Sequence, residues 1–228
     1  MGINIEKYKF LLEELKGKAT LVAVSKTKPI ADIEELYNLG QRDFGENYVQ
    51  ELVDKATVLP KDIRWHFIGH LQSNKVKYIA PFVHLIHGVD SLSLLQEINK
   101  QALKNNRIID CLLQIHIAKE ETKFGLDADE LQQLLSTVKG DDKYKNVQIN
   151  GLMGMASFSD DKAVVTNEFK FLRTLYDLNS SKNPVDQTTT NPFSILSMGM
   201  SGDYSIAINE GSNMVRIGSL LFGERNTI

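Results

Sequence analysis

Short apolar segments rich in β-branched residues alternate with amphipathic helical segments along the whole chain, and this alternation constrains the fold more than any other feature. After a helical segment near the N-terminus, eight strand-like segments follow, each with a helix or a turn behind it. Strands that alternate with helices are joined by right-handed crossovers, so they lie parallel to one another. The expected strands are residues 21–24, 43–45, 65–68, 84–89, 108–117, 147–153, 195–197 and 214–217.

Eight strand–helix units predict a single α/β domain, a (β/α)8 TIM barrel over residues 1–228. The chain is short for this fold, and a doubly wound open sheet is the alternative. The polar stretch 180–192 lies between the sixth and seventh units, where we expect a surface loop rather than a domain boundary. The expected helices are residues 5–15, 30–39, 49–56, 75–79, 92–104, 129–138, 163–178 and 205–210, with a short turn or helix after Leu220.

Charge and cysteine content exclude several classes of protein. The net charge is -3 and no basic run occurs, which argues against nucleic-acid binding. The single cysteine, Cys111, lies in an apolar run and is expected to be a buried residue of a protein from a reducing compartment. Neither a signal peptide nor an apolar stretch of the ~20 residues that span a membrane is present. We therefore expect a cytoplasmic protein.

Lys26 lies at the end of the first expected strand, just before the turn. Chemistry in a barrel of this kind gathers at the C-terminal ends of the strands. A lysine that projects from a strand end into the mouth of the barrel is partly desolvated, which favours the neutral amine that attacks an aldehyde. An ordinary lysine at the rim is the alternative.

Glycine and serine residues cluster after the seventh strand, in residues 197–203, and along the eighth, in residues 215–219. Barrel enzymes often bind phosphate with the loops after these two strands, where backbone N–H groups are uncrowded. Each cluster alone would also suit an ordinary turn, but the two together indicate a phosphate site. In a closed barrel the eighth strand neighbours the first, so Lys26, Arg216 and Gly218 can face one cavity. A ligand with an aldehyde at one end and a phosphate at the other would fit between them.

The histidines do not predict a metal site. His84 and His87 are three residues apart, and this spacing places side chains on opposite faces of a strand. His66 and His70 are four residues apart, which leaves them roughly 13 Å apart on a strand. We expect no metal ion, and no P-loop or dinucleotide fingerprint occurs.

The chain resembles the pyridoxal phosphate homeostasis proteins, whose fold looks like the barrel domain of alanine racemase standing alone, the type III fold of proteins that bind pyridoxal 5′-phosphate (PLP). The resemblance runs over nearly the full chain and rests on motifs in a fixed order. These are residues 24–27 (VSKT), 45–48 (GENY), 65–75 (WHFIGHLQSNK), 123–125 (KFG), 151–156 (GLMGMA), 197–203 (SMGMSGD), 215–219 (VRIGS) and 222–223 (FG).

The resemblance implies a PLP site. Lys26 would hold PLP as a Schiff base, and Asn47 would lie beside the cofactor ring. The phosphate would be held by Ser201, Gly218 and Ser219. No residue is assigned a catalytic role.

Arg216, by the same resemblance, would face the pyridine nitrogen of PLP. A guanidinium that stays protonated donates a hydrogen bond there and discourages protonation of the ring, which makes the ring a weaker electron sink. Such a site would stabilise a full carbanion poorly.

The chain departs from the family pattern in three places. Ser219 stands where threonine is usual and keeps the hydroxyl, the residue after Lys123 is large where a small one is usual, and the stretch 180–192 has no counterpart. A secondary role for Lys123 is therefore left open. Three motif residues are expected to serve as core or rim rather than as ligands: Glu46, Trp65 and His66.

The function implied is that of a carrier that binds PLP, shields its aldehyde and passes it to PLP-dependent apo-enzymes, so that cellular vitamin B6 stays in balance without catalytic turnover. The alternative is an amino-acid racemase. Racemisation needs a second base on the opposite face of the substrate, which the racemases take from a separate β domain across a dimer interface. Because the barrel uses the whole chain, we expect a monomeric carrier. A barrel for another phosphorylated ligand is the third hypothesis.

Overall fold

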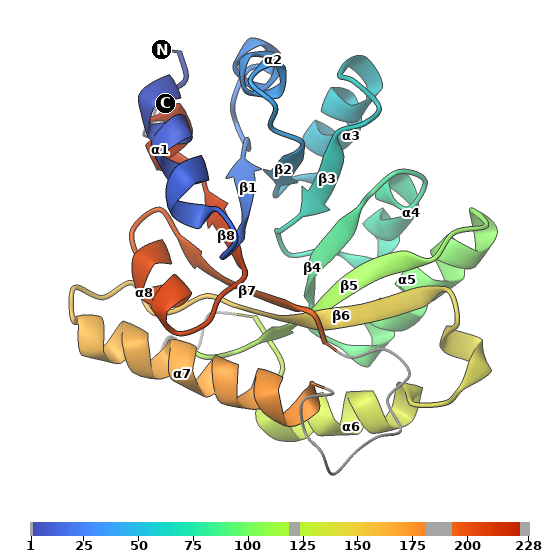
Figure 1. Cartoon of the computed structure of the whole chain (residues 1–228). Helices are drawn as coiled ribbons and strands as arrows, with labels where there is room; N and C mark the ends of the chain where they lie inside the picture. The colour runs from blue at the N-terminus through green and yellow to red at the C-terminus, as the bar shows by residue number, and fades with distance from the viewer. Residues whose placement is uncertain (1, 119–123, 181–192, 224–228) are drawn as a thin grey trace.

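Eight parallel strands close into a barrel in the computed structural model, which describes residues 2–118, 124–180 and 193–223 (Figure 1). Each strand pairs with the next along the chain, and β8 pairs with β1. This closure confirms the predicted (β/α)8 barrel and excludes the open sheet. The strands are β1 Thr20–Val24, β2 Asp43–Glu46, β3 Arg64–Phe67, β4 Leu85–Val89, β5 Ile109–Ile115, β6 Val147–Gly154, β7 Ile195–Met200 and β8 Met214–Ile217.

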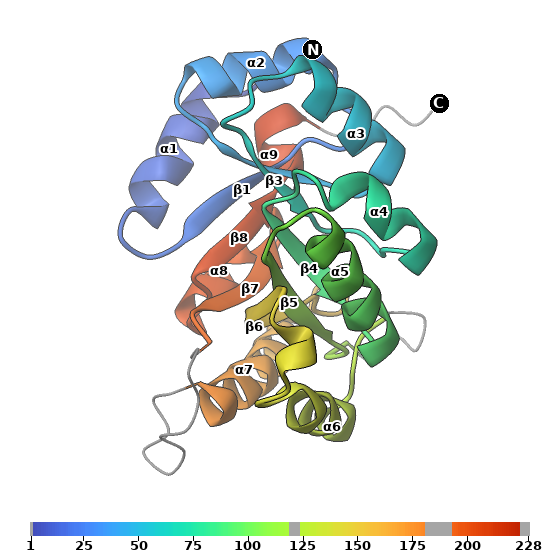
Figure 2. The ribbon, with the colours of Figure 1, turned by 90° about the vertical axis from the view of Figure 1, so that its right-hand side faces the viewer.

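Helices surround the barrel and pack against the outer faces of the strands (Figures 1 and 2). At some of their N-termini a side chain accepts a backbone N–H bond, as Asn4 does from Lys7 at 2.9 Å. The helices are α1 Ile5–Leu15, α2 Ile30–Asn38, α3 Val49–Val58, α4 Val76–Ile79, α5 Leu92–Lys104, α6 Ala128–Val138, α7 Lys162–Asn179, α8 Tyr204–Asn209 and α9 Ser219–Phe222, with 3₁₀ turns η1 Ser73–Lys75 and η2 Asp142–Tyr144.

Apolar side chains pack in two separate layers, one between strands and helices and one inside the barrel. On β8, Val215 and Ile217 belong to the outer layer and Met214 to the inner one. Since side chains alternate along a strand, Arg216 points into the barrel with Met214. The inner apolar layer consists of Val22, Leu85, Leu112, Met153 and Met214.

The predicted elements differ from the structure mainly at their ends. The helix expected at 75–79 is divided between η1 and α4, and η2 was not expected. Strand β7 runs three residues further than predicted, through Gly199, whose φ of +96° suits glycine, and its register against β8 shifts between Ser197 and Met200. This irregularity lies just before the loop that carries Ser201.

No helix among the described residues is long and apolar enough to cross a membrane. Cys111 is fully buried, as expected, and burial raises the pKa of its thiol. Lys123 and residues 181–192 of the expected loop lie outside the described residues.

Candidate functional site

The C-terminal ends of β1, β7 and β8 bring together the predicted site residues. The backbone N–H of Gly218 donates to Ser201 Oγ at 3.2 Å. Gly218 also lies against β1, since a Cβ at this glycine would stand 3.4 Å from the Cβ and carbonyl oxygen of Val24. Lys26 follows Val24 by two residues, and Ser219 begins α9 directly after Gly218. The turn that carries Lys26 therefore adjoins the two glycine- and serine-rich loops.

The turn that carries Lys26 has a strained backbone. Thr27 adopts a φ of +61°, a left-handed conformation that costs a β-branched residue roughly 1–2 kcal/mol. Its N–H donates to Glu51 Oε1 at 2.6 Å, and the N–H of Lys28 donates to the carbonyl of Ser25 at 3.0 Å. Strain of this kind persists where the surroundings hold the backbone, and it is concentrated at functional sites.

A buried ionic network lies beneath this turn. Lys55 Nζ donates to the carbonyl of Ser25 at 2.7 Å, to Glu46 Oε1 at 2.8 Å and to Glu51 Oε1 at 2.6 Å. Ser25 Oγ donates to Glu46 Oε1 at 2.6 Å. Burial raises the pKa of Glu46, and the charge and hydrogen bond of Lys55 oppose that rise. The network holds the backbone before Lys26, and Glu46 is a buried residue, as expected.

Asn47 offers a buried acceptor on the neighbouring strand end. Among the described residues, its Oδ1 and Glu46 Oε2 are the buried side-chain atoms without a hydrogen-bond partner. A buried acceptor left without a donor costs about 1–3 kcal/mol. Gly69 packs against the Asn47 backbone so closely that a Cβ there would collide with the Asn47 carbonyl. The unpaired oxygen fits a bound molecule that supplies a donor.

Arg216 is the buried cation of the barrel interior, with 3% of its surface exposed. Its Nη1 donates to the carbonyl and the Oγ of Ser197 at 2.9 and 2.6 Å, and its Nη2 donates to the carbonyl of Gly154 at 3.0 Å. Burial lowers the pKa of Arg216 to about 10, and the charge of Asp203 opposes this effect. The guanidinium is therefore protonated at neutral pH.

Two histidines continue from Ser197 into the barrel. Ser197 Oγ lies 3.2 Å from His87 Nδ1, and His87 Nε2 lies 2.9 Å from His66 Nδ1. His66 Nε2 lies 3.0 Å from Asp43 Oδ1. The sequence interpretation considered histidines along single strands and so missed this contact between β3 and β4. The available signal was that His66 and His87 both fall on inward positions of adjacent strands.

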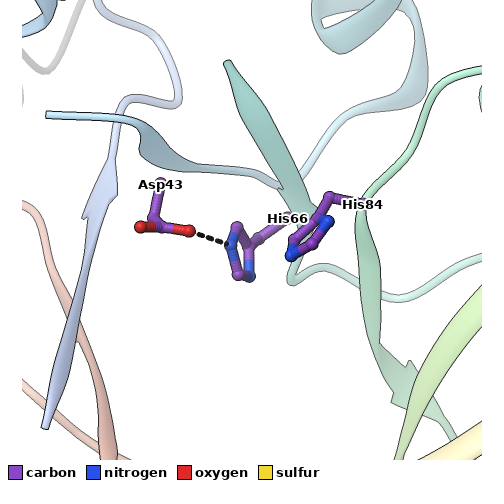
Figure 3. A group of neighbouring side chains, drawn as sticks. All are labelled: Asp43, His66 and His84. Atoms are coloured by element: carbon purple, nitrogen blue, oxygen red, sulfur yellow. Dashed lines mark hydrogen bonds and ion pairs between the residues drawn. The ribbon is translucent and has the colours of Figure 1, made fainter. Parts of the chain in front are cut away.

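The far end of the barrel holds a cluster of three potential metal ligands, Asp43, His66 and His84 (Figure 3). Each offers one ligand atom, and these atoms all lie within 4.8 Å of one another. Asp43 is already bound by His66 and by Arg64 Nε at 2.7 Å. Burial acts to raise the pKa of Asp43, but hydrogen bonds from Arg64 and His66 hold it well below its usual value. A divalent cation at Asp43 would have to displace the Arg64 guanidinium or bind beside it. The expectation that the protein holds no metal ion stays a prediction.

Comparison with known proteins identifies relatives along almost the whole chain. The family model described as alanine racemase, N-terminal domain, matches residues 4–226. The pyridoxal phosphate homeostasis protein of Aquifex aeolicus is 41% identical over 208 residues, which cover 91% of this chain and 87% of the relative. Its human counterpart is 39% identical over 218 residues, covering 90% and 76%.

Solved structures agree with these matches. PipY of Synechococcus elongatus, solved with PLP bound, superposes with a TM-score of 0.83 at 35% identity, over 96% of this chain and 99% of PipY. Alanine racemase of Bartonella henselae, solved with covalently bound PLP, superposes with a TM-score of 0.68 over 99% of this chain and 62% of the racemase. At 17% identity, this second likeness shows the barrel fold alone.

Proposed function

Because the chain belongs to the alanine racemase N-terminal domain family, and within it to the pyridoxal phosphate homeostasis proteins, we propose that it binds PLP as a Schiff base on Lys26. It acts as one PLP-binding domain over residues 1–228 that carries the cofactor and maintains vitamin B6 homeostasis without catalytic turnover. It works in the cytoplasm as a monomer, and its partners are PLP-dependent apo-enzymes.

The convergence of three functional groups at one end of the barrel carries this proposal. Lys26, the hydrogen-bonded pair of Ser201 and Gly218, and the guanidinium of Arg216 come from β1, β7 and β8, which are neighbours in the closed sheet. PLP presents an aldehyde, a phosphate and a pyridine nitrogen, and these groups match an amine, a hydroxyl with backbone N–H donors, and a cationic donor. When bound, PLP supplies an electrophilic aldehyde on an electron-withdrawing ring.

Each residue of the site has a defined task. The amine of Lys26 would hold the aldehyde end of PLP. Ser201, Gly218 and Ser219 bind the phosphate oxygens, and the unpaired Oδ1 of Asn47 accepts a hydrogen bond beside the ring.

The position proposed for Arg216 favours a PLP carrier over a PLP-dependent enzyme. A protonated guanidinium donates to the ring nitrogen and keeps the ring a weak electron sink, which serves retention of the aldehyde better than carbanion chemistry. The names of the curated relatives support the same proposal, because those from Aquifex aeolicus and human are pyridoxal phosphate homeostasis proteins.

The test is to trap the cofactor on its lysine. PLP added to the purified protein is expected to give a visible absorption band, and borohydride reduction is expected to leave a pyridoxyl group on the peptide that contains Lys26. Lys26→Ala should lose both signals. Lys28→Ala is the matched control, because Lys28 lies in the same turn but its Nζ donates to the carbonyls of Phe222 and Gly223. Label spread over surface lysines, with Lys26→Ala unaffected, would contradict the site.

Turnover is tested separately. The PLP-loaded protein is incubated with L-alanine and other L-amino acids, and the D-enantiomers are measured by chiral chromatography. A carrier produces them no faster than free PLP does. Faster production would show that the protein is a racemase and not a carrier.

A further inference from the structure

A continuous chain of hydrogen bonds crosses the barrel interior from Arg216 to Asp43. Arg216 Nη1 lies 2.6 Å from Ser197 Oγ, which lies 3.2 Å from His87 Nδ1. The remaining links are His87 to His66 at 2.9 Å and His66 to Asp43 at 3.0 Å. All five residues are buried, and they come from five strands, β8, β7, β4, β3 and β2. Figure 3 shows the last link, between His66 and Asp43.

The chemistry of the two ends fixes the first and last bonds of this chain. Arginine only donates, so Ser197 Oγ accepts from Arg216, and a carboxylate only accepts, so His66 Nε2 donates to Asp43. When each imidazole carries a single proton, the hydrogen between the two rings sits on His87 Nε2, and Ser197 Oγ donates to His87 Nδ1. In that arrangement all four bonds donate toward the carboxylate.

Apart from the charge of Asp203, which favours the protonated guanidinium, the interior around this chain is unfavourable for a charge. The inner layer is apolar, and the hydrogen bonds of Arg216 go to neutral acceptors on Ser197 and Gly154. A buried guanidinium with neutral partners is costly unless other charge stabilises it. Hydrogen bonds that donate in one direction polarise one another, so the chain transmits the attraction of the Asp43 carboxylate to the cation.

Resting on the proposed binding of PLP, we propose that Ser197, His87 and His66 are positioning residues that couple Arg216 to the carboxylate of Asp43. The chain holds the guanidinium toward the ring nitrogen and fixes it as a donor. The ring nitrogen thereby stays an acceptor. The specificity of the site for holding PLP thus depends on residues that do not touch the cofactor.

Ser197 is the link to break, because its hydroxyl alone joins the guanidinium to the histidines. Ser197→Ala removes this hydroxyl, and Ser197→Thr keeps it. The matched control is Ser212→Ala. Ser212 is also a buried serine between β7 and β8, but its hydroxyl bonds to the carbonyls of Leu196, Met198 and Met214 and takes no part in the chain. Both alanine variants remove a buried hydroxyl, so a general loss of packing affects them alike.

The first measurement uses the protein without PLP. Long-range ¹H–¹⁵N spectra report which imidazole nitrogen carries the proton. The wild type and Ser212→Ala are expected to show His87 and His66 as neutral Nε2–H tautomers, and Ser197→Ala should shift the Nδ1 resonance of His87. A proton on Nδ1 of either histidine in the wild type would overturn the chain.

The second measurement titrates PLP into each variant and follows its visible band. Ser197→Ala is expected to bind about tenfold more weakly, because a charge-assisted hydrogen bond is lost, and to shift the band. Ser212→Ala should stay within about twofold of the wild type, and Ser197→Thr should restore binding. Equal affinity and an equal band in Ser197→Ala would overturn the positioning role. Wild-type protein that binds no PLP would instead refute the proposed function, while the spectra of the apo-protein still decide whether the chain exists.

Discussion

The residues around Lys26 show how the backbone of a turn is held in place by side chains from a neighbouring helix. Lys26 lies in a turn with a left-handed Thr27, and the ammonium of Lys55 and the carboxylate of Glu51 bind that turn from α3. A buried salt bridge is weak evidence of stability by itself. Here the salt bridge also stabilises the local backbone, because Lys55 Nζ donates to the carbonyl of Ser25, the residue just before Lys26.

Loss of Lys55 should be costly. Lys55→Met leaves the fully buried Glu46 carboxylate without its cation, which typically destabilises a protein by about 3–5 kcal/mol. Lys100→Met is the control, because Lys100 is exposed and pairs with Glu97 on one helix face, so the change should stay within about 1 kcal/mol. The free energy of unfolding in urea measures both. Similar values for the two variants would show that Glu46 does not depend on Lys55.

Local signals in the sequence place the ends of some elements correctly. The predicted bounds of α1 and α5 agree with the structure, because amphipathic periodicity and capping residues are local signals, and the predicted bounds of β8 agree as well. The ends of β5 and β7 were misplaced, since register shifts depend on the neighbouring strand. The same reason explains the missed contact between His66 and His87. Spacing along one strand is visible in a sequence, whereas the pairing across two strands is not.

The N-terminus of α6 offers a test at this scale. Asp127 accepts from the N–H of Glu130 at 2.8 Å, and the Glu130 carboxylate accepts from the N–H of Asp127 at 3.0 Å, which together form a capping box. Asp127→Ala should lower the free energy of unfolding by about 1 kcal/mol. Gln133→Ala, an exposed change inside the same helix, should have little effect. Equal losses would mean that the box does not stabilise α6.

In the barrel as a whole, local sequence motifs indicate the candidate site, whereas the contacts of the buried interior depend on which strands are neighbours in the closed sheet. Lys26, Arg216 and Gly218 were predicted to face one cavity because β8 must neighbour β1 in a closed barrel, and the strand pairing shows that β1 and β8 are neighbours. Their roles toward PLP, together with those of Asn47 and Ser219, stay predictions. Asp43 was not predicted as part of any site, since its partners come from β3 and from the loop ahead of β4.

The pH dependence of stability should reveal the buried histidine. Burial lowers the pKa of His87 well below its usual value, and the neighbouring His66, Arg216 and His84 act in the same direction. The folded protein then stays unprotonated at His87 while the unfolded chain takes up a proton below about pH 6.5. The stability contributed by neutral His87 is full above that pH and decreases below it, by up to about 1.4 kcal/mol per pH unit.

Urea unfolding between pH 5 and pH 8 measures this effect. The wild type should lose stability from pH 7 to pH 5, and His87→Gln should show a smaller slope. His70→Gln is the control, because His70 is 44% exposed and pairs with Asp90 outside the chain. A wild-type stability that rises on acidification would show that His87 is charged in the folded protein.

The pairing of β8 with β1 also has a consequence during synthesis. The ribosome makes Lys26 well before Arg216, Gly218 and Ser219, so a nascent chain carries the amine long before the groups proposed to hold the phosphate and the ring. Contacts between residues so distant in the sequence form late in folding. Retention of PLP at the proposed site therefore has to await synthesis of β8, so capture of the cofactor would report that translation has passed this strand.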